Sequence, residues 1–282
     1  MVVATATRRR ADGGPSARSL LISVLGQWVG PNDTPVWTAT LVGALEALGI
    51  ESRAARQAVN RTASDGWLEG ESIGRYTRWR LTGSGRRMIG SAVPRVQRSI
   101  VAGEKWDGSF LLLTVTGTAL DRESRERLAV GLDFEGFGTL GTGTWVAVGE
   151  GSREGADSVL AACGLKDEAL LFHATTVEGA ETPAEVVAMA WDLETAAAAH
   201  EAFVSEFEDA VPSDDAEAFA LRTRMAHEWR HILSVDPSLP PELLPEDWIG
   251  TRARKVFQRQ FSQWANAATS YYIRLSEELV VS

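Results

Sequence analysis

The stretch Ser52–Leu81 reads SRAARQAVNRTASDGWLEGESIGRYTRWRL, and it contains the strongest structural signal in the chain. Up to about Ser64, small or apolar residues recur at helical spacing, with long polar residues between them. We expect Ser52 to cap this helix. Its inward face would consist of Ala54, Ala55, Ala58, Val59 and Thr62. Its outward face would consist of Arg53, Arg56, Gln57, Asn60 and Arg61.

The outward face is a row of hydrogen-bond donors. Arginine, glutamine and asparagine can each bond bidentately to guanine or adenine edges in the major groove of DNA. The inward face is small, as close packing on a preceding helix requires. A row of arginines on an isolated helix is most often only a solvated face, so this interpretation needs support from the rest of the chain.

Support comes from the residues that follow the helix. Gly66–Glu69 is expected to begin a strand, Ser72–Arg75 to turn, and Tyr76–Leu81 to return as a second strand. The turn and the return strand present Arg75 and Arg78, which would contact phosphates or the minor groove.

Two helices are expected before this stretch. Leu20, Leu21, Val24, Leu25 and Trp28 share one helical face. Val36-Trp37 is extended, and Thr38 caps a second helix that Gly49 ends. The expected order is two helices, then the helix with the donor face as recognition helix, then the hairpin. This is the order of a winged helix-turn-helix. We place this DNA-binding domain at residues 17–100, after a disordered basic tail at 1–16.

The charge is divided unevenly along the chain. Residues 1–100 hold 14 arginines against 7 acidic residues, a net of +7, although the 282 residues together carry −10. Residues 101–282 therefore carry −17. Without the arginines of the tail, residues 11–100 still carry +4. This asymmetry is typical of a protein in which a basic module, here residues 1–100, binds a polyanion and the acidic remainder of the chain does not.

The middle of the chain predicts a βαββαβ order. Strands are expected at Phe110–Val115 and Ala169–Val177, two short ones within Thr139–Val148, and helices at Asp121–Leu132 and Ala156–Cys163. That order is the ferredoxin-like arrangement, which we place at residues 101–180. Residues 181–282 form a helical C-terminal domain, with helices at Ala184–Ala210, Asp214–Val235 and Arg252–Leu279. The fold class is therefore α+β.

One motif suggests a different function. His227-Glu228-Trp229-Arg230-His231 matches H-E-x-x-H, in which two histidines one turn apart hold zinc and the glutamate activates water. The positions at which metzincins carry a glycine and a third histidine are Ser234 and Pro237 here. We expect a packing and hydrogen-bonding role, without metal or cofactor. A zinc-dependent hydrolase stays as the alternative.

The chain resembles the PaaX family of repressors. The resemblance rests on Arg53–Arg61 and Gly66-Trp67-Leu68, on Trp106-Asp107-Gly108, and on a long C-terminal run that begins with His227-Glu228-Trp229-Arg230. That run continues through Asp236-Pro237, Leu239-Pro240, Glu242–Pro245 and Asp247-Trp248.

The resemblance implies a homodimer that binds palindromic double-stranded operator DNA and is released by a small-molecule effector. The effector would be an aryl-CoA thioester or a related aromatic catabolite. The middle domain also resembles a CRISPR-associated nuclease fold, but Thr114–Thr118 contains no carboxylate for metal, so we expect no enzyme. Candidate effector residues are Trp145, His173, His227, Glu228, Arg230 and Trp248.

Two further features concern the cellular location. No apolar run approaches the roughly 18 residues of a membrane span. The chain has one cysteine, Cys163, which permits no internal disulfide and agrees with a reducing compartment. We therefore expect a cytoplasmic protein that does not bind membranes.

Overall fold

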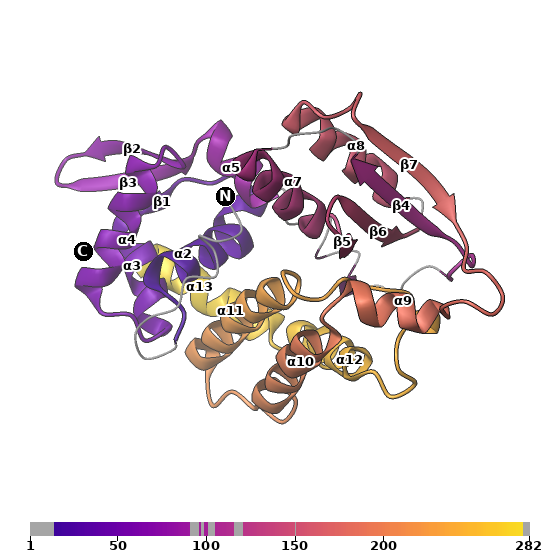
Figure 1. The fold of residues 1–282 in the computed structure, drawn as a ribbon. Helices are drawn as coiled ribbons and strands as arrows, with labels where there is room; N and C mark the ends of the chain where they lie inside the picture. The colour runs from indigo at the N-terminus through magenta and orange to yellow at the C-terminus, as the bar shows by residue number, and fades with distance from the viewer. Residues whose placement is uncertain are drawn as a thin grey trace. The chain divides into compact units, whose positions relative to one another are not determined.

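The computed structural model describes residues 14–90, 96, 99–100, 105–115, 121–149 and 151–278. Helices and two small antiparallel sheets make up the chain (Figure 1). The described residues form two compact units. Unit 1 contains those of 1–100, 201–231 and 251–282, and unit 2 contains those of 101–200 and 232–250. Of the predicted basic tail, residues 1–13 lie outside the described part.

The described N-terminal part of unit 1 contains four α-helices and a three-stranded sheet. Its elements are α2 (Ala17–Val24), a π-helical turn (Leu25–Val29), a 3-10 turn (Gly30–Asn32), β1 (Val36–Trp37), α3 (Thr38–Ala47), α4 (Ser52–Ser64), β2 (Leu68–Ile73), β3 (Tyr76–Leu81) and α5 (Gly83–Gly90). The sheet is antiparallel with the order β1-β3-β2. The helices and strands predicted for this part of the chain are therefore present.

The core of this part is formed by the buried apolar residues of α2, α3 and α4 and of the sheet. Ser16 caps α2 by accepting a hydrogen bond from the Ser19 amide at 3.2 Å. The predicted inward residues of the first helix, Leu20, Leu21, Val24, Leu25 and Trp28, are all buried. Gly49 follows α3 with φ +74, a left-handed conformation that glycine adopts without steric cost.

Two predicted helix caps are wrong. Ser52 is the first residue inside α4, and Glu51 takes the N-cap position without a side-chain hydrogen bond. Thr38 is likewise the first residue of α3, after Trp37. The Thr38 hydroxyl instead donates to the Thr77 carbonyl at 3.1 Å and accepts from the Trp79 indole at 2.8 Å. The Thr38 hydroxyl therefore bonds to β3 and does not cap α3, the role that local sequence preference predicted for it.

The C-terminal helices complete unit 1. They are the end of α10 (Leu193–Phe207), α11 (Asp215–Ile232), α12 (Ile249–Gln263) and α13 (Ala265–Glu278). Trp28 contacts Phe219 of α11 and Tyr272 of α13, with ring centroids 5.1 Å and 5.2 Å apart. The core around α2–α4 therefore includes side chains that lie more than 190 residues after Trp28 in the sequence.

The single C-terminal helix predicted at Arg252–Leu279 is wrong. The structure has two helices, α12 and α13, which meet at Trp264, and Leu279 lies outside the described residues. The Trp264 side chain is 2% exposed. Helical spacing continues across this position in the sequence, so the break could not be found from periodicity.

Unit 2 contains the predicted βαββαβ order. Its elements are β4 (Phe110–Val115), α7 (Arg122–Phe134), β5 (Gly138–Gly141), β6 (Thr144–Val148), α8 (Gly151–Cys163) and β7 (Ala169–Ala174). The antiparallel sheet has the order β5-β6-β4-β7. Leu113 and Trp145 pack with Leu128 of α7 and Leu160 of α8 on one face of the sheet.

The other face of this sheet is partly covered by α9 (Pro183–Ala190). Phe110 and Val146 pack there against Val187 of α9 and against Leu239 and Leu243 of the proline-rich loop. That loop, residues 236–248, contains a 3-10 turn at Pro241–Leu243. Within the described part of the chain, no helix is long and apolar enough to cross a membrane.

The long helix predicted at Ala184–Ala210 is also wrong, because it is interrupted between α9 and α10. Trp191 has extended backbone angles, φ −129 and ψ 143. Asp192 then starts α10 by accepting hydrogen bonds from the amide and hydroxyl of Thr195 at 3.0 Å and 2.6 Å. The Trp191 indole donates to the Gly136 carbonyl at 3.2 Å. A contact with a turn far away in the sequence thus holds the corner at which α9 ends and α10 begins.

Candidate nucleic-acid interface

The outer face of α4 is exposed along its whole length. Its opposite face is buried against α2 and α3. The buried side chains are small, namely Ala55, Ala58, Val59 and Thr62. The exposed side chains are the five predicted donors, Arg53, Arg56, Gln57, Asn60 and Arg61. The structure thus places all five on one solvent-facing side of a single helix.

The small buried face lets α4 approach its neighbours closely. Thr62 is the only polar member of that face, and its hydroxyl donates to the Ala58 carbonyl at 2.8 Å. At the end of the helix, Arg18 of α2 forms an ion pair with Asp65 and lies 5.0 Å from the centre of the Trp67 ring. These contacts fix the orientation of α4, and therefore of its donors.

Arg75 lies in the two-residue turn of the β2–β3 hairpin. Gly74 precedes it with φ +61, and Ile73 pairs with Tyr76 across the turn. Glycine at the first central position is typical of a type II′ turn. The Arg75 guanidinium donates to the Tyr76 hydroxyl at 2.5 Å and lies 4.9 Å from the centre of that ring. The tip of the hairpin thus carries an exposed cation next to an aromatic ring.

Arg78 lies further along β3 and has an acidic neighbour. It donates to the Glu71 carboxylate at 2.9 Å and lies 5.7 Å from the centre of the Trp37 ring. Glu71 is the register partner of Arg78 across the hairpin. This ion pair was not predicted from the sequence, although it follows once the hairpin register is known. A phosphate at Arg78 would therefore compete with Glu71.

Two of the candidate effector residues, His227 and Arg230, contact α2. Ser23 bonds to the His227 Nδ1 atom at 3.1 Å and accepts from the Arg230 guanidinium at 2.7 Å. The Arg230 guanidinium also lies 3.3 Å from His227 Nδ1 and 3.5 Å from the Ser19 carbonyl. Burial lowers the pKa of Arg230 to about 10, which leaves it charged at neutral pH. This polar cluster joins α11 to α2, the helix on which α4 packs.

The remaining candidate effector residues do not form one group. Glu228 is half-buried on α11. Trp145 is 6% exposed and belongs to the core beneath the four-stranded sheet. His173 is exposed on β7. Trp248 lies edge-on to His200, with ring centroids 5.8 Å apart.

A buried histidine–aspartate pair was missed. His200 Nε2 lies 2.7 Å from Asp236 Oδ2, and His200 is 2% exposed. The Asp236 Oδ1 atom accepts from the Ser238 amide at 2.7 Å, which supports the left-handed φ of +56 at Ser238. The pair holds α10 to the start of the proline-rich loop. No local pattern links residues 36 positions apart, so the sequence carried no signal for it.

Two residues of the H-E-x-x-H motif, His227 and Trp229, are held by hydrogen bonds to distant parts of unit 1. His227 is bonded through Nδ1 as described above, and a guanidinium beside an imidazole disfavours a second cation on that ring. Trp229 between the histidines is buried and donates to the Ser99 hydroxyl at 2.9 Å. Among the described residues, no group of three or more His, Cys, Asp or Glu side chains could hold a metal ion. Nothing in this geometry favours a zinc-dependent hydrolase.

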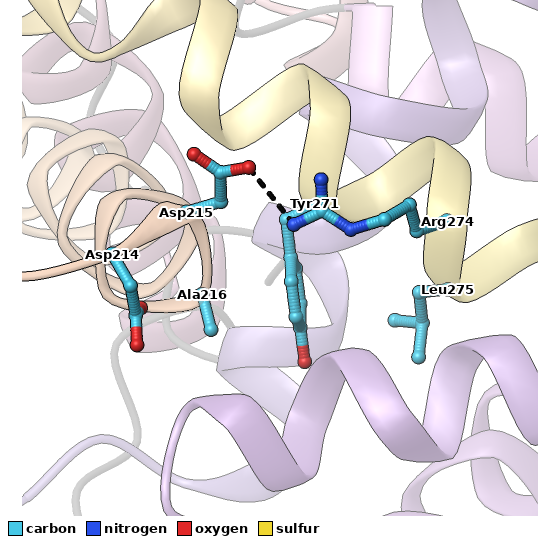
Figure 2. A pocket seen from close by; sticks show the side chains of 6 residues that line it. All are labelled: Asp214, Asp215, Ala216, Tyr271, Arg274 and Leu275. Atoms are coloured by element: carbon cyan, nitrogen blue, oxygen red, sulfur yellow. Dashed lines mark ion pairs between the residues drawn. The ribbon is translucent and has the colours of Figure 1, made fainter.

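Unit 1 also contains a pocket that the sequence analysis did not predict. Its volume is about 420 Å³, and it is lined by Asp214, Asp215, Ala216, Tyr271, Arg274 and Leu275 (Figure 2). Arg274 pairs with Asp215 at 2.9 Å. Leu275 packs on Gly43 of α3, where a Cβ atom would lie 2.7 Å from the Leu275 side chain. None of the candidate effector residues lines this pocket.

Comparisons with known proteins identify the family. Three family models match successive parts of the chain: "PaaX-like protein" at residues 16–85, "PaaX protein central Cas2-like domain" at 103–187 and "PaaX-like protein C-terminal domain" at 191–274. The chain is 28% identical to "Transcriptional repressor PaaX" of Escherichia coli (strain K12) over 275 residues, which cover 94% of this chain and 85% of that protein. The chain therefore belongs to the PaaX family, which confirms the predicted resemblance.

A solved structure has a similar fold. The uncharacterized protein Rv0674 from Mycobacterium tuberculosis matches with a TM-score of 0.59 and 22% sequence identity. The match covers 90% of this chain and 98% of that chain. At this identity the likeness concerns the fold alone.

Proposed function

We propose that this protein is a transcriptional repressor that binds duplex DNA through α4 and the β2–β3 hairpin. The observation that carries the proposal is the exposed donor face of α4, opposite a buried face of small side chains. The name of the Escherichia coli relative, a transcriptional repressor, supports it. Membership in this family also supports a regulator rather than an enzyme. As a DNA-binding regulator, it would act in the cytoplasm.

The N-terminal elements support a winged helix-turn-helix. Helices α2, α3 and α4 precede a hairpin that pairs with β1. In such a module the third helix enters the major groove, and the hairpin contacts the adjacent backbone. Arg53, Arg56, Gln57, Asn60 and Arg61 would face base edges, and Arg75 and Arg78 would contact phosphates. In unit 2, the order β5-β6-β4-β7 supports a ferredoxin-like arrangement.

Repression would involve two copies of the chain. A dimer that places one α4 in each half-site of a palindrome needs half-site centres about 34–36 Å apart, or a multiple of this distance. The negative charge of residues 101–282 would restrict DNA contact to the basic module, because the remainder repels phosphates.

A small effector would release the DNA. We propose an aryl-CoA thioester or a related aromatic catabolite, with Trp145, His173, His227, Glu228, Arg230 and Trp248 as candidate contacts. His227 and Arg230 offer the most direct link, because both bond to Ser23 of α2. A ligand that displaces Arg230 from Ser23 would disturb the helix that supports α4.

The test is a fluorescence-anisotropy titration on duplex DNA from the promoter of the protein's own operon. Arg56→Ala and Asn60→Ala should each weaken operator binding by roughly 1–3 kcal/mol, with a much smaller effect on unrelated DNA. Arg122→Ala and Asn266→Ala, both exposed and outside α4, are the matched controls. Operator binding that matches the wild type in both α4 variants would contradict the proposal.

Two further arms of the titration characterise the interface. Raising the salt concentration should weaken binding steeply, because phosphate contacts release counterions. Arg78→Ala should weaken binding to operator and unrelated DNA about equally. Adding phenyl-substituted acyl-CoAs should release the operator, and Arg230→Ala should change the concentration at which they do so.

A further inference from the structure

The tip of the β2–β3 hairpin is exposed and partly apolar. Residues Glu71–Tyr76 are all exposed, and two of them are large apolar side chains: Ile73 is 39% exposed and Tyr76 is 40% exposed. Ile73 and Tyr76 are register partners across the turn, so their side chains lie on one face of the hairpin. Arg75 lies between them in the chain. The tip therefore combines one guanidinium with two exposed apolar side chains.

Tyr76 also fixes the side chain of Arg75. The Arg75 guanidinium donates to the Tyr76 hydroxyl at 2.5 Å and lies 4.9 Å from the centre of the Tyr76 ring. Tyr76 is in turn held by Trp37 of β1, which lies edge-on to it with ring centroids 6.3 Å apart. A long side chain that is already ordered loses less conformational entropy when it binds. The arginine at the tip is therefore prepared for a contact of defined geometry.

A contact with phosphates alone does not account for this arrangement. Phosphates need positive charge and hydrogen-bond donors, and they leave exposed apolar side chains without a use. The minor groove of DNA has both kinds of surface, because deoxyribose rings form its walls and acceptor atoms of the bases lie on its floor. Its negative potential is strongest where the groove is narrow, as in A·T-rich tracts, and attracts arginine there. An arginine beside two apolar side chains is complementary to such a groove.

The position of the hairpin in unit 1 agrees with this partner. The Trp67 amide donates to the Thr62 carbonyl at 3.2 Å, so the chain enters β2 directly from the end of α4. An element beside a helix in the major groove can reach the adjacent minor groove. Charge agrees as well, because residues 11–100 carry +4 whereas residues 101–282 carry −17. The tip thus lies in the part of the chain that attracts a polyanion.

We propose that Arg75 enters the minor groove next to the major-groove site of α4, and that Tyr76 positions it there. Ile73 and the Tyr76 ring would then lie against the deoxyribose walls. The hairpin would thereby favour A·T-rich DNA, whose minor groove is narrow, at base pairs that α4 does not contact. This replaces the phosphate contact proposed above for Arg75 and leaves Arg78 at the backbone. The inference rests on the proposed function, because it requires α4 to bind duplex DNA.

The experiment compares two duplexes that differ at the minor-groove edge of their bases. Both carry the promoter sequence of the protein's own operon, and in one of them hypoxanthine replaces every guanine. This replacement removes the amino group that guanine places in the minor groove, and it leaves the acceptors of the major-groove edge unchanged. Fluorescence anisotropy of the full-length protein gives the two dissociation constants. We expect the wild type to bind the hypoxanthine duplex roughly three- to tenfold more tightly, because its minor groove resembles that of A·T-rich DNA.

Four variants, checked for folding by circular dichroism, test the roles of the two residues. Arg75→Ala should abolish the preference for the hypoxanthine duplex. Arg75→Lys keeps the charge, but because an ammonium is more strongly hydrated it should retain little of the preference. Tyr76→Phe keeps the ring and loses the hydrogen bond, so it should reduce the preference and leave binding to the guanine duplex nearly unchanged. Arg80→Ala, at an exposed arginine further along β3, is the matched control and should weaken binding to both duplexes equally.

The outcomes separate this inference from the proposed function. Equal binding of the wild type to both duplexes would overturn the inference and leave the proposed function intact. A preference that Arg75→Ala or Arg75→Lys retains in full would do the same, since lysine serves a phosphate contact as well as arginine does. A wild-type preference in Tyr76→Phe would overturn the positioning role of Tyr76. Absence of binding to either duplex would overturn the proposed function, and the inference with it.

Discussion

Gly85 shows how a single residue determines the packing of the hairpin against its neighbours. This glycine in α5 is buried, and a Cβ atom there would lie 2.2 Å from the Trp67 carbonyl oxygen. The amide of Gly85 also donates to the Thr82 hydroxyl at 3.0 Å, which holds the first turn of α5 against the end of β3. A backbone oxygen cannot move aside as a flexible side chain can. Any larger residue must therefore separate α5 from the start of the hairpin.

We expect Gly85→Ala to destabilise unit 1 by about 1–3 kcal/mol, the usual cost of overpacking a close contact. Gly90→Ala is the matched control, since a Cβ atom there meets nothing within 4 Å. The free energy of unfolding in urea measures both. An unfolding free energy for Gly85→Ala equal to that of the wild type would show that α5 can shift without cost.

Glu71 should limit the affinity of the hairpin for DNA. Its carboxylate holds Arg78 at 2.9 Å and adds a negative charge where a phosphate would approach. Glu71→Gln is therefore expected to tighten binding to operator and unrelated DNA alike by roughly two- to fivefold, the scale of an exposed ion pair. Glu154→Gln, exposed on α8, is the control for net charge. Anisotropy titrations that show no change, or weaker binding, would contradict a phosphate contact at Arg78.

At the scale of elements, the corner between α9 and α10 depends on one side chain. The Trp191 ring packs against Gly138 of β5, where a Cβ atom would lie 2.7 Å from the indole and 2.6 Å from the Ala190 carbonyl. Its indole also donates to Gly136. The tryptophan thus ties the corner of two helices to the edge of the sheet, and the alanine-rich sequence around it cannot continue as one helix.

We expect Trp191→Ala to destabilise unit 2 by about 2–4 kcal/mol, because a large half-buried ring is lost. Trp191→Phe keeps most of the apolar contact and loses the hydrogen bond, so it should cost only about 1 kcal/mol. Thermal unfolding followed by circular dichroism distinguishes the two. Similar losses for both substitutions would mean that the hydrogen bond, and not the ring, holds the corner.

At the scale of the whole molecule, unit 1 is built from parts that are distant in the sequence. Phe219 and Ala268 belong to the same core as α2, α3 and α4. Trp28 is 7% exposed, and it donates to the Thr223 hydroxyl at 3.2 Å. Helices α2, α3 and α4, which we propose as part of the DNA-binding module, therefore need α11 and α13 to bury their own apolar surface.

A fragment of residues 1–100 should accordingly be much less stable than unit 1 in the full chain. Removing the partners of Trp28 alone should cost about 3–5 kcal/mol, the scale of losing a buried aromatic contact. Thermal unfolding and the tryptophan fluorescence of the fragment test this. A fragment that unfolds cooperatively at the temperature of the full protein would show that the N-terminal elements form an independent domain.

Local pattern alone was sufficient for much of the fold and for the donor face of the candidate interface. The spacing of Ala55, Ala58 and Val59 against the intervening arginines predicted both faces of α4, because a helix repeats every 3.6 residues. Gly74 marked the hairpin turn, since few other residues adopt its conformation. The βαββαβ order followed from period and length in the same way.

Only the tertiary structure decided the features that depend on distant partners. The interruption between α9 and α10 at Trp191 and the buried His200–Asp236 pair both depend on contacts between segments that local periodicity cannot relate. Whether an aromatic side chain continues a helix or ends it depends on what it can be buried against. The sequence by itself determined which elements form and which faces they expose. The packing of distant segments determined where those elements end.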